Sequence, residues 1–161
     1  MRDNDYLEER LFSLWEDHFA DVPRKNLVLI KFGKYSKRQL GSIRWITKRT
    51  GDKGLLKKRE SELDEQDDKR ITLITVTRYF QDPTVPDYVV DATIAHELVH
   101  YVHGFHSPLK QVYKHPHKGG VIEKELRKRG LGKMHGAATT WQRANWQKFI
   151  LASIVKKKLH L

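Results

Sequence analysis

The stretch YVVDATIAHELVHYVHG, residues 88–104, restricts the possible folds of this chain more than any other. Its apolar residues recur at helical spacing and Gly104 is a typical residue just beyond a helix end, so we predict one helix over the stretch. His96 and His100 then lie four residues apart on one face, with Cβ atoms about 5–6 Å apart, and can bind one metal ion. Glu97 leaves the helix at the next position, so the HExxH spacing predicts a zinc site with Glu97 as general base.

A catalytic zinc ion takes three protein ligands and leaves one position open for water, so a third ligand is required. Two histidines are candidates. His106 lies six residues beyond His100, where the chain can turn back after the helix. His117 directly precedes the next predicted helix, which would hold its side chain rigidly at the metal. The local pattern leaves this choice open.

Other polar side chains near the motif are weaker candidates. His115 is separated from His117 by a proline and should point in a different direction. His103 lies too far along the helix axis to share an ion with both histidines of the motif. The remaining candidates lie downstream: Glu123 and Glu125 as ligands, ranked below the histidines, and His135 as an oxyanion stabiliser.

The chain contains no cysteine, which excludes disulfides, thiolate chemistry and zinc fingers, so a metal must be bound by histidine and carboxylate side chains. Its length of 161 residues predicts a single domain over residues 1–161. The acidic start MRDNDYLEERLF is not typical of a secretory signal, and no apolar run approaches the roughly 20 residues that span a bilayer. We therefore expect a cytoplasmic protein without a membrane partner.

The order of the other elements predicts an α+β fold with an antiparallel or mixed sheet. Residues 50–70 show no apolar period and change charge sign halfway, which predicts an irregular excursion. Ser107 followed by Pro108 predicts a short helical turn over residues 107–113. The periodicities predict an N-terminal helix at 3–20, three strands at 26–33, 41–49 and 70–80, a helix at 119–130, and a basic C-terminal helix at 137–158 packed on the domain.

Positive charge is concentrated in two segments. Residues 24–59 carry 13 basic and 1 acidic side chains, and residues 127–161 carry 9 basic side chains and no acidic one, in a chain of net charge +11. These segments flank an acidic middle that contains the HExxH motif, so we expect them to bind a polyanion such as DNA. Tyr35 and Trp45 are available for stacking on bases, although a core position is the stronger expectation for Trp45. The alternative is a solvated basic face without a partner.

The run from RITLITVTRYFQDPTVPDYVVDATIAHELVHYVHG through HPHKGGVIEKELRKRGLG resembles the SprT-like zinc metallopeptidases, the group that includes bacterial SprT and the Spartan proteases. Their pattern is a strand, a short break, the HExxH helix, a loop, and a third histidine at the start of the next helix. The resemblance covers roughly residues 25–135. It implies a zincin-like domain in which His96, His100 and His117 bind zinc, and a protease that in some members acts on DNA-bound proteins.

The chain departs from this pattern in two places. The third histidine of the family is usually followed by glycine and a bulky aromatic residue, whereas this segment reads HKGGVI, and the cysteine zinc ribbon that many relatives append is missing. The stretch HELVHYVHGFH also fits the related WLM-type protease pattern HExxHxxxGxH, in which His106 would be the ligand. That pattern requires a longer continuous helix, which Pro108, Pro116 and Gly119 interrupt, so we favour His117.

We therefore expect a zinc-dependent metalloendopeptidase that hydrolyses peptide bonds of protein substrates. Glu97 would act as general base and then donate a proton to the leaving amine, and the substrate backbone would lie along an exposed sheet edge. Two alternatives belong to other classes. One is a basic nucleic-acid-binding protein with a structural zinc site that includes both His106 and His117, and the other is a zinc hydrolase that acts on a small molecule in a closed pocket.

Overall fold

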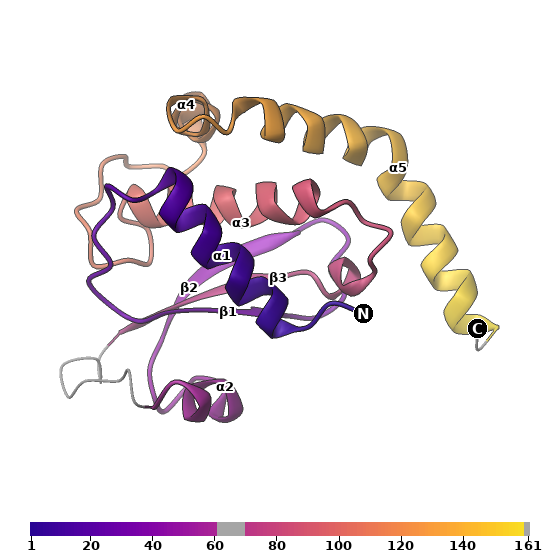
Figure 1. Ribbon diagram of the computed structural model, residues 1–161, viewed down its shortest axis with the longest axis horizontal. Helices are drawn as coiled ribbons and strands as arrows, with labels where there is room; N and C mark the ends of the chain where they lie inside the picture. Colours follow the sequence, from indigo (N-terminus) through magenta and orange to yellow (C-terminus); the bar gives the residue numbers. More distant parts are fainter. Residues whose placement is uncertain (61–69, 160–161) are drawn as a thin grey trace.

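The computed structural model describes residues 1–60 and 70–159 and shows an α+β fold, as the sequence predicts, in which helices cover a small mixed sheet (Figure 1). Its strands are β1 (Val28–Phe32), β2 (Gly41–Ile46) and β3 (Ile71–Val76). Its α-helices are α1 (Asn4–His18), α2 (Lys53–Lys58), α3 (Asp87–Val102), α4 (Val121–Lys128) and α5 (Gly132–Lys158). The short 3-10 helices η3 (Arg78–Gln81) and η4 (Lys118–Gly120) precede α3 and α4.

The sheet has the strand order β1-β3-β2, with the central β3 parallel to β1 and antiparallel to β2. Side chains alternate between the two faces of a strand. Val28, Ile30 and Phe32 of β1 accordingly face the main core, while Leu29 joins a second apolar cluster. Within the described part of the chain, no strand pairs with the outer edge of β2, so β2 is an edge strand.

The prediction of an irregular excursion over residues 50–70 is wrong for its first part, where α2 forms. The carboxylate of Asp52 caps α2 by accepting a hydrogen bond from the backbone N–H of Leu55 (3.2 Å). Leu55 and Leu56 are buried in the second apolar cluster, against the sheet. Two adjacent leucines show no helical period, which is why the pattern concealed the helix. The rest of the predicted excursion, residues 61–69, lies outside the described residues.

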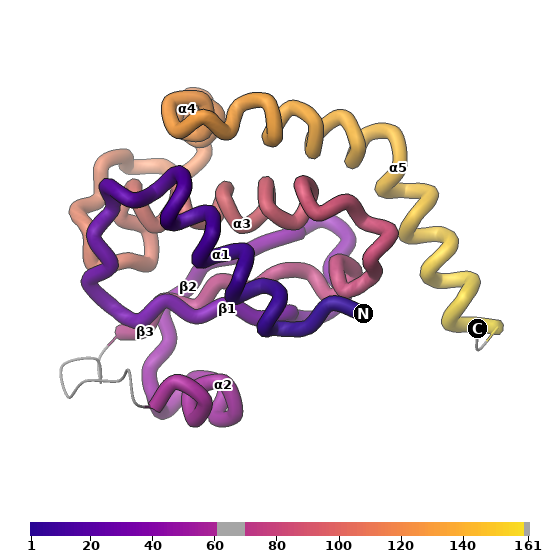
Figure 2. The backbone as a smooth tube through the Cα atoms, viewed as in Figure 1, coloured from indigo at the N-terminus to yellow at the C-terminus, as the bar shows by residue number. Residues whose placement is uncertain are grey.

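Helix α3 is enclosed by other elements: it contacts α1, α4, α5, β2 and β3 (Figures 1 and 2). Most of its residues are buried. Arg10 of α1 forms a bidentate ion pair with the buried carboxylate of Asp91 on α3, and Arg10 Nε lies 2.8 Å from Asp91 Oδ1. Such a pair has defined geometry, so α1 sets the orientation of α3 about its own axis.

The chain turns sharply after α3, and Gly104 beyond the helix end has a left-handed φ of 83°, as its predicted capping role requires. An added Cβ there would lie 2.5 Å from the backbone of Gln111, which crosses at this point. The predicted helical turn over residues 107–113 is wrong, because the chain forms no helix there. Ser107 instead donates its hydroxyl hydrogen bond to the carbonyl of Tyr101 (2.7 Å) and so holds the loop against α3.

Helix α5 begins at Gly132, earlier than the predicted start at residue 137, and its first part lies across α3 and α4 (Figure 1). Glycines in the segment LGKMHG, which are weak helix formers, concealed this start. Ala138 and Ile150 are buried, and the rings of Trp146 and Phe149 stack with centroids 5.4 Å apart. In the described part of the chain, no helix is long and apolar enough to cross a membrane.

Replacing Gly104 by alanine should destabilise the fold by roughly 1–3 kcal/mol, because alanine disfavours the left-handed conformation and its Cβ meets the crossing backbone. Urea denaturation of both proteins measures the change. Gly136→Ala is the matched control: this glycine lies within α5 and an added Cβ has nothing within 4 Å. The control should be neutral or stabilising by up to about 1 kcal/mol. Equal midpoints for the two variants would contradict the described turn.

Candidate metal centre

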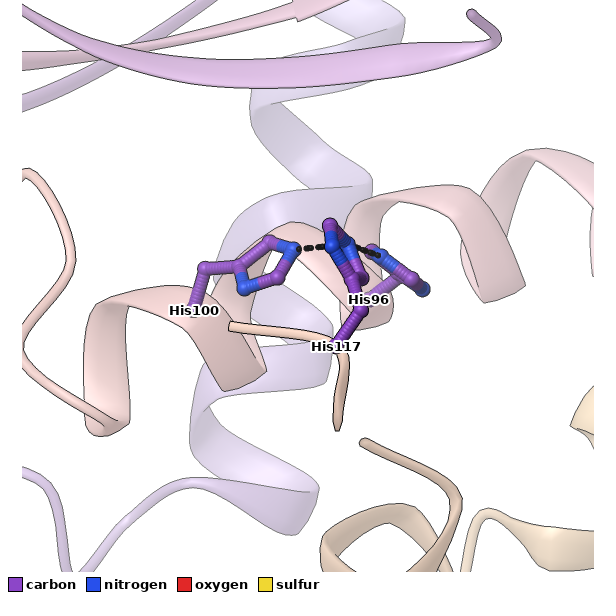
Figure 3. Close-up of side chains that lie close together, drawn as sticks. All are labelled: His96, His100 and His117. Carbon is purple, nitrogen blue, oxygen red and sulfur yellow. Dashed lines mark hydrogen bonds between the residues drawn. The ribbon is translucent and has the colours of Figure 1, made fainter. Parts of the chain in front are cut away.

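Three histidine side chains converge from two parts of the chain (Figure 3). His96 and His100 project from neighbouring turns of α3, and His117 comes from the loop before η4. The Nε2 atom of His117 lies 3.3 Å from that of His96 and 3.0 Å from that of His100, and the candidate ligand atoms all lie within 4.8 Å of one another. Two nitrogen ligands bound tetrahedrally at about 2.0–2.1 Å from one zinc ion are about 3.3 Å apart. The three nitrogens therefore fit one metal ion.

The position of His117 depends on the turn into α4. Gly119 and Gly120 have left-handed φ values of 78° and 66°, so the chain reverses direction between His117 and the helix. Ile122 and Leu126 of α4 are buried in the main core. The packing of α4 thus holds the turn, and the turn presents His117 to the two histidines of α3.

The other histidines of the region lie outside this cluster. His106, the alternative third ligand, lines the cavity beside the cluster, but its ring nitrogens are not among the clustered ligand atoms. Its carbonyl accepts a hydrogen bond from the Thr72 hydroxyl (2.8 Å). His115 is exposed. His103 is buried elsewhere, with Nε2 3.8 Å from Oε2 of Glu125, so this glutamate pairs with His103 and is not directed at the cluster.

Glu97 lies beside the cluster and is buried, with 5% of its surface exposed. Burial raises the pKa of its carboxyl to about 8. The start of β2 covers this side chain, because a Cβ on Gly41 would lie 2.9 Å from Glu97 Oε1 and 2.8 Å from Cγ2 of Thr93. Glycine at the first position of β2 therefore leaves the space that the carboxylate occupies. Among the described residues no hydrogen bond engages the Glu97 carboxylate, which is available to a molecule in the cavity.

Burial, followed by the neighbouring imidazoles, lowers the pKa of both α3 histidines, to about 4 for His96 and about 3 for His100. Both rings are therefore neutral at pH 7 in the metal-free protein and offer a nitrogen lone pair. His100 turns Nε2 towards the cluster, and its buried Nδ1 has no hydrogen-bond partner among the described residues. The donor set is thus three imidazoles, of which the two on α3 are neutral, and imidazole nitrogen suits zinc.

A cavity of about 470 Å³ opens beside the cluster. One face of α3 lines it, and residues 38–43, which include the start of β2, form one wall. The first turns of α5, including His135, form another part of the wall, and the loops at residues 105–106 and 116–117 complete the lining. The clustered histidines and Glu97 therefore face a space that a ligand can enter.

Sequence reasoning identified the histidines and Glu97 but missed most of the cavity walls. Thr139 and Gln142 of α5 line the cavity, although nothing in the helical pattern distinguishes them from solvent-facing polar residues. Arg38 and Gln39 belong to the loop before β2 and likewise carry no local signal. Only the folding of distant segments around α3 places these side chains together.

No protein-family model, curated protein sequence or solved structure matches this chain. The SprT-like and WLM-type resemblances thus rest on the quoted motifs. Independently of them, the folded chain provides three convergent imidazoles, a buried carboxylate and an adjoining cavity.

His117→Ala should weaken zinc binding by at least about 100-fold, because it removes one of three ligands. Loss of a direct ligand should cost more affinity than loss of a residue that only hydrogen-bonds a ligand. Competition with a chromogenic chelator measures the affinity. His115→Ala is the matched control, since this histidine lies two residues away outside the cluster, and it should bind zinc like the unmodified protein. Retention of zinc by His117→Ala, combined with loss in His106→Ala, would show that His106 is the third ligand.

Proposed function

We propose that this protein is a zinc-dependent metalloendopeptidase with a zincin-like, SprT-type domain that hydrolyses peptide bonds of protein substrates. The observation that carries the proposal is the convergence of His96, His100 and His117 beside the buried carboxylate of Glu97 at an accessible cavity. Three histidine ligands leave one tetrahedral position open, which is the composition of catalytic zinc sites. Within the described ranges no further histidine, aspartate or glutamate joins the cluster.

Glu97 is the residue that would move protons in this reaction. A bound zinc ion would supply Lewis acidity, which polarises the scissile carbonyl and lowers the pKa of a water molecule. Glu97 would take the proton of that water and later donate it to the leaving amine. Burial makes its carboxylate a stronger base than an exposed glutamate, because the charged form is poorly solvated.

The outer edge of β2 is the proposed binding site for the substrate backbone. Gly41, Ser42 and Ile43 line the cavity, and their strand has a partner on one side only within the described part of the sheet. An extended peptide added to this edge would form main-chain hydrogen bonds independently of its sequence. Because Gly41 abuts Glu97, a peptide in that position would pass its backbone carbonyls close to the proposed base.

The structural-zinc alternative differs from the proposal in its ligand set. It expects both His106 and His117 to bind the metal, whereas only His117 of these two belongs to the described cluster.

The small-molecule alternative expects a closed pocket, and a substrate test separates it from the proposal. Cleavage of an unstructured protein such as casein at several internal bonds supports an endopeptidase, whereas turnover of small esters alone supports the alternative.

Glu97→Gln should lower kcat/KM for casein cleavage by about 10²–10⁴-fold, since glutamine has nearly the same shape but cannot accept the proton. Zinc affinity should remain within a fewfold of the unmodified protein, because Glu97 is not a ligand. Zinc content and the rate of fluorescent casein release are measured on the same samples. An unchanged cleavage rate in zinc-loaded Glu97→Gln would refute the proposed mechanism.

A second proposed property is binding of DNA, because the two basic segments meet in space. Trp146 Nε1 of α5 donates a hydrogen bond to the carbonyl of Lys37 (2.8 Å). Lys157 Nζ lies 3.6 Å from the ring centroid of Tyr35, and the Arg78 guanidinium carbon lies 5.8 Å from the same centroid. Two cations therefore lie close to the Tyr35 ring, and 46% of this residue's surface is exposed. Clustered cations of this kind can follow phosphates.

Tyr35→Ala combined with Lys157→Gln should weaken binding of a single-stranded oligonucleotide by roughly tenfold at low salt, because one cation is lost and another is no longer positioned. Fluorescence anisotropy at several salt concentrations gives the affinity and its salt slope. Lys110→Gln is the control, since this exposed lysine lies in the loop after α3, away from the Tyr35 cluster, and it should reduce affinity less. Equal losses in both proteins would indicate a diffuse charge effect without a defined surface.

A further inference from the structure

Arg38 stands out among the residues that line the cavity. It is the only lysine or arginine in the cavity wall within the described part of the chain. Its side chain is exposed, and no hydrogen bond or ion pair to another described residue engages its guanidinium. Other basic side chains of the same segment, such as Lys34, Lys37 and Arg44, do not line the cavity. Arg38 therefore offers a positive charge to whatever occupies the cavity.

The backbone on both sides of Arg38 is held in place. On the preceding side, the Lys37 carbonyl accepts the hydrogen bond from Trp146 (2.8 Å). On the following side, the backbone N–H of Thr77 donates to the carbonyl of Leu40 (2.8 Å). These bonds tie the loop to α5 and to the end of β3. The backbone of Arg38, which carries the guanidinium, is therefore held at the rim of the cavity.

The cavity near Arg38 contains no compensating acid. Glu97 is the only carboxylate in the described cavity lining, and it is buried beside the histidines. The other neighbours of the rim are apolar or neutral, among them Leu40, Ala92 and Gln142. We propose that Arg38 makes the enzyme select acidic segments of protein substrates, by pairing with an aspartate or glutamate side chain close to the cleaved bond. The inference rests on the proposed peptidase function.

The position of Arg38 relative to β2 limits where this preference can lie along the substrate. Gly41, the first residue of β2, abuts Glu97, and Arg38 lies three residues before it in the preceding loop. Three residues span at most about 10 Å, a distance that an extended peptide covers with three residues. The acidic side chain should therefore lie within three positions of the cleaved bond, on one side of it only.

The size of the effect follows from the exposure of Arg38. A pair between exposed charges is weak, so glutamate should be preferred over glutamine by about fivefold in kcat/KM at low salt. Added salt should reduce the preference, because the rim is open to solvent. A buried specificity pocket would instead give a large ratio that salt hardly changes.

Competition between otherwise identical peptides that carry Glu, Gln or Lys at one position tests this inference on the zinc-loaded protein. The unmodified enzyme should prefer Glu, and Arg38→Glu should prefer Lys, because a reversed charge attracts the opposite partner. Arg44→Glu is the matched control: it reverses an exposed arginine on β2 that does not line the cavity, and it should retain the preference for Glu. Thermal midpoints of the three proteins exclude differences in folding.

The outcomes separate the inference from the function on which it rests. Cleavage that depends on Glu97 but shows no charge preference, or an equal change in Arg38→Glu and Arg44→Glu, overturns the role of Arg38 and leaves the peptidase intact. Absence of any cleavage that depends on Glu97 overturns both. If Arg38→Glu loses oligonucleotide binding while its peptide preference is unchanged, Arg38 contacts nucleic-acid phosphate and the inference is wrong.

Discussion

The enclosure of α3 is the constraint on which the rest of this structure depends. The helix is buried against α1, the sheet, α4 and α5, and the bidentate pair between Arg10 and Asp91 sets its rotation. Close-packed interiors allow little freedom of rotation to such a helix. His96, Glu97 and His100 are consequently directed at a stretch of the helix surface that adjoins the cavity. A surface helix carrying the same motif would lack the cavity walls and the burial of Glu97 and His100.

Burial also sets the electrostatics of the site. It keeps the imidazoles of His96 and His100 neutral at pH 7 and raises the pKa of the Glu97 carboxyl, so the metal-free centre carries little charge. Both basic segments contribute to the cavity lining, through the loop before β2 and through the first turns of α5, and the Trp146 side chain ties this loop to α5 through the Lys37 carbonyl. The proposed recognition of a substrate or a polyanion and the proposed chemistry of the cavity would therefore depend on the same packed elements.

Local periodicity predicted much of the fold. The α3 helix, its end near Gly104 and the apolar face of β1 each follow from the spacing of apolar residues and glycine within that single element. The same reasoning missed α2, whose leucines are buried by the distant sheet, and it assigned a helical turn to residues 107–113, where Ser107 bonds instead to Tyr101. Both errors arise where a tertiary contact overrides a local preference.

The sequence limited the side chains from which the candidate site can be built. Without cysteine, two histidines at helical spacing and the glutamate between them allow a histidine-rich metal centre with an adjacent base. The choice between His106 and His117 required the folded chain, because both can approach the motif through a flexible loop. The left-handed turn at Gly119 and Gly120 and the buried face of α4 bring His117 to the cluster. The spacing of residues along one helix determines which side chains lie together on that helix. The position of a side chain from another segment depends instead on how the whole core packs.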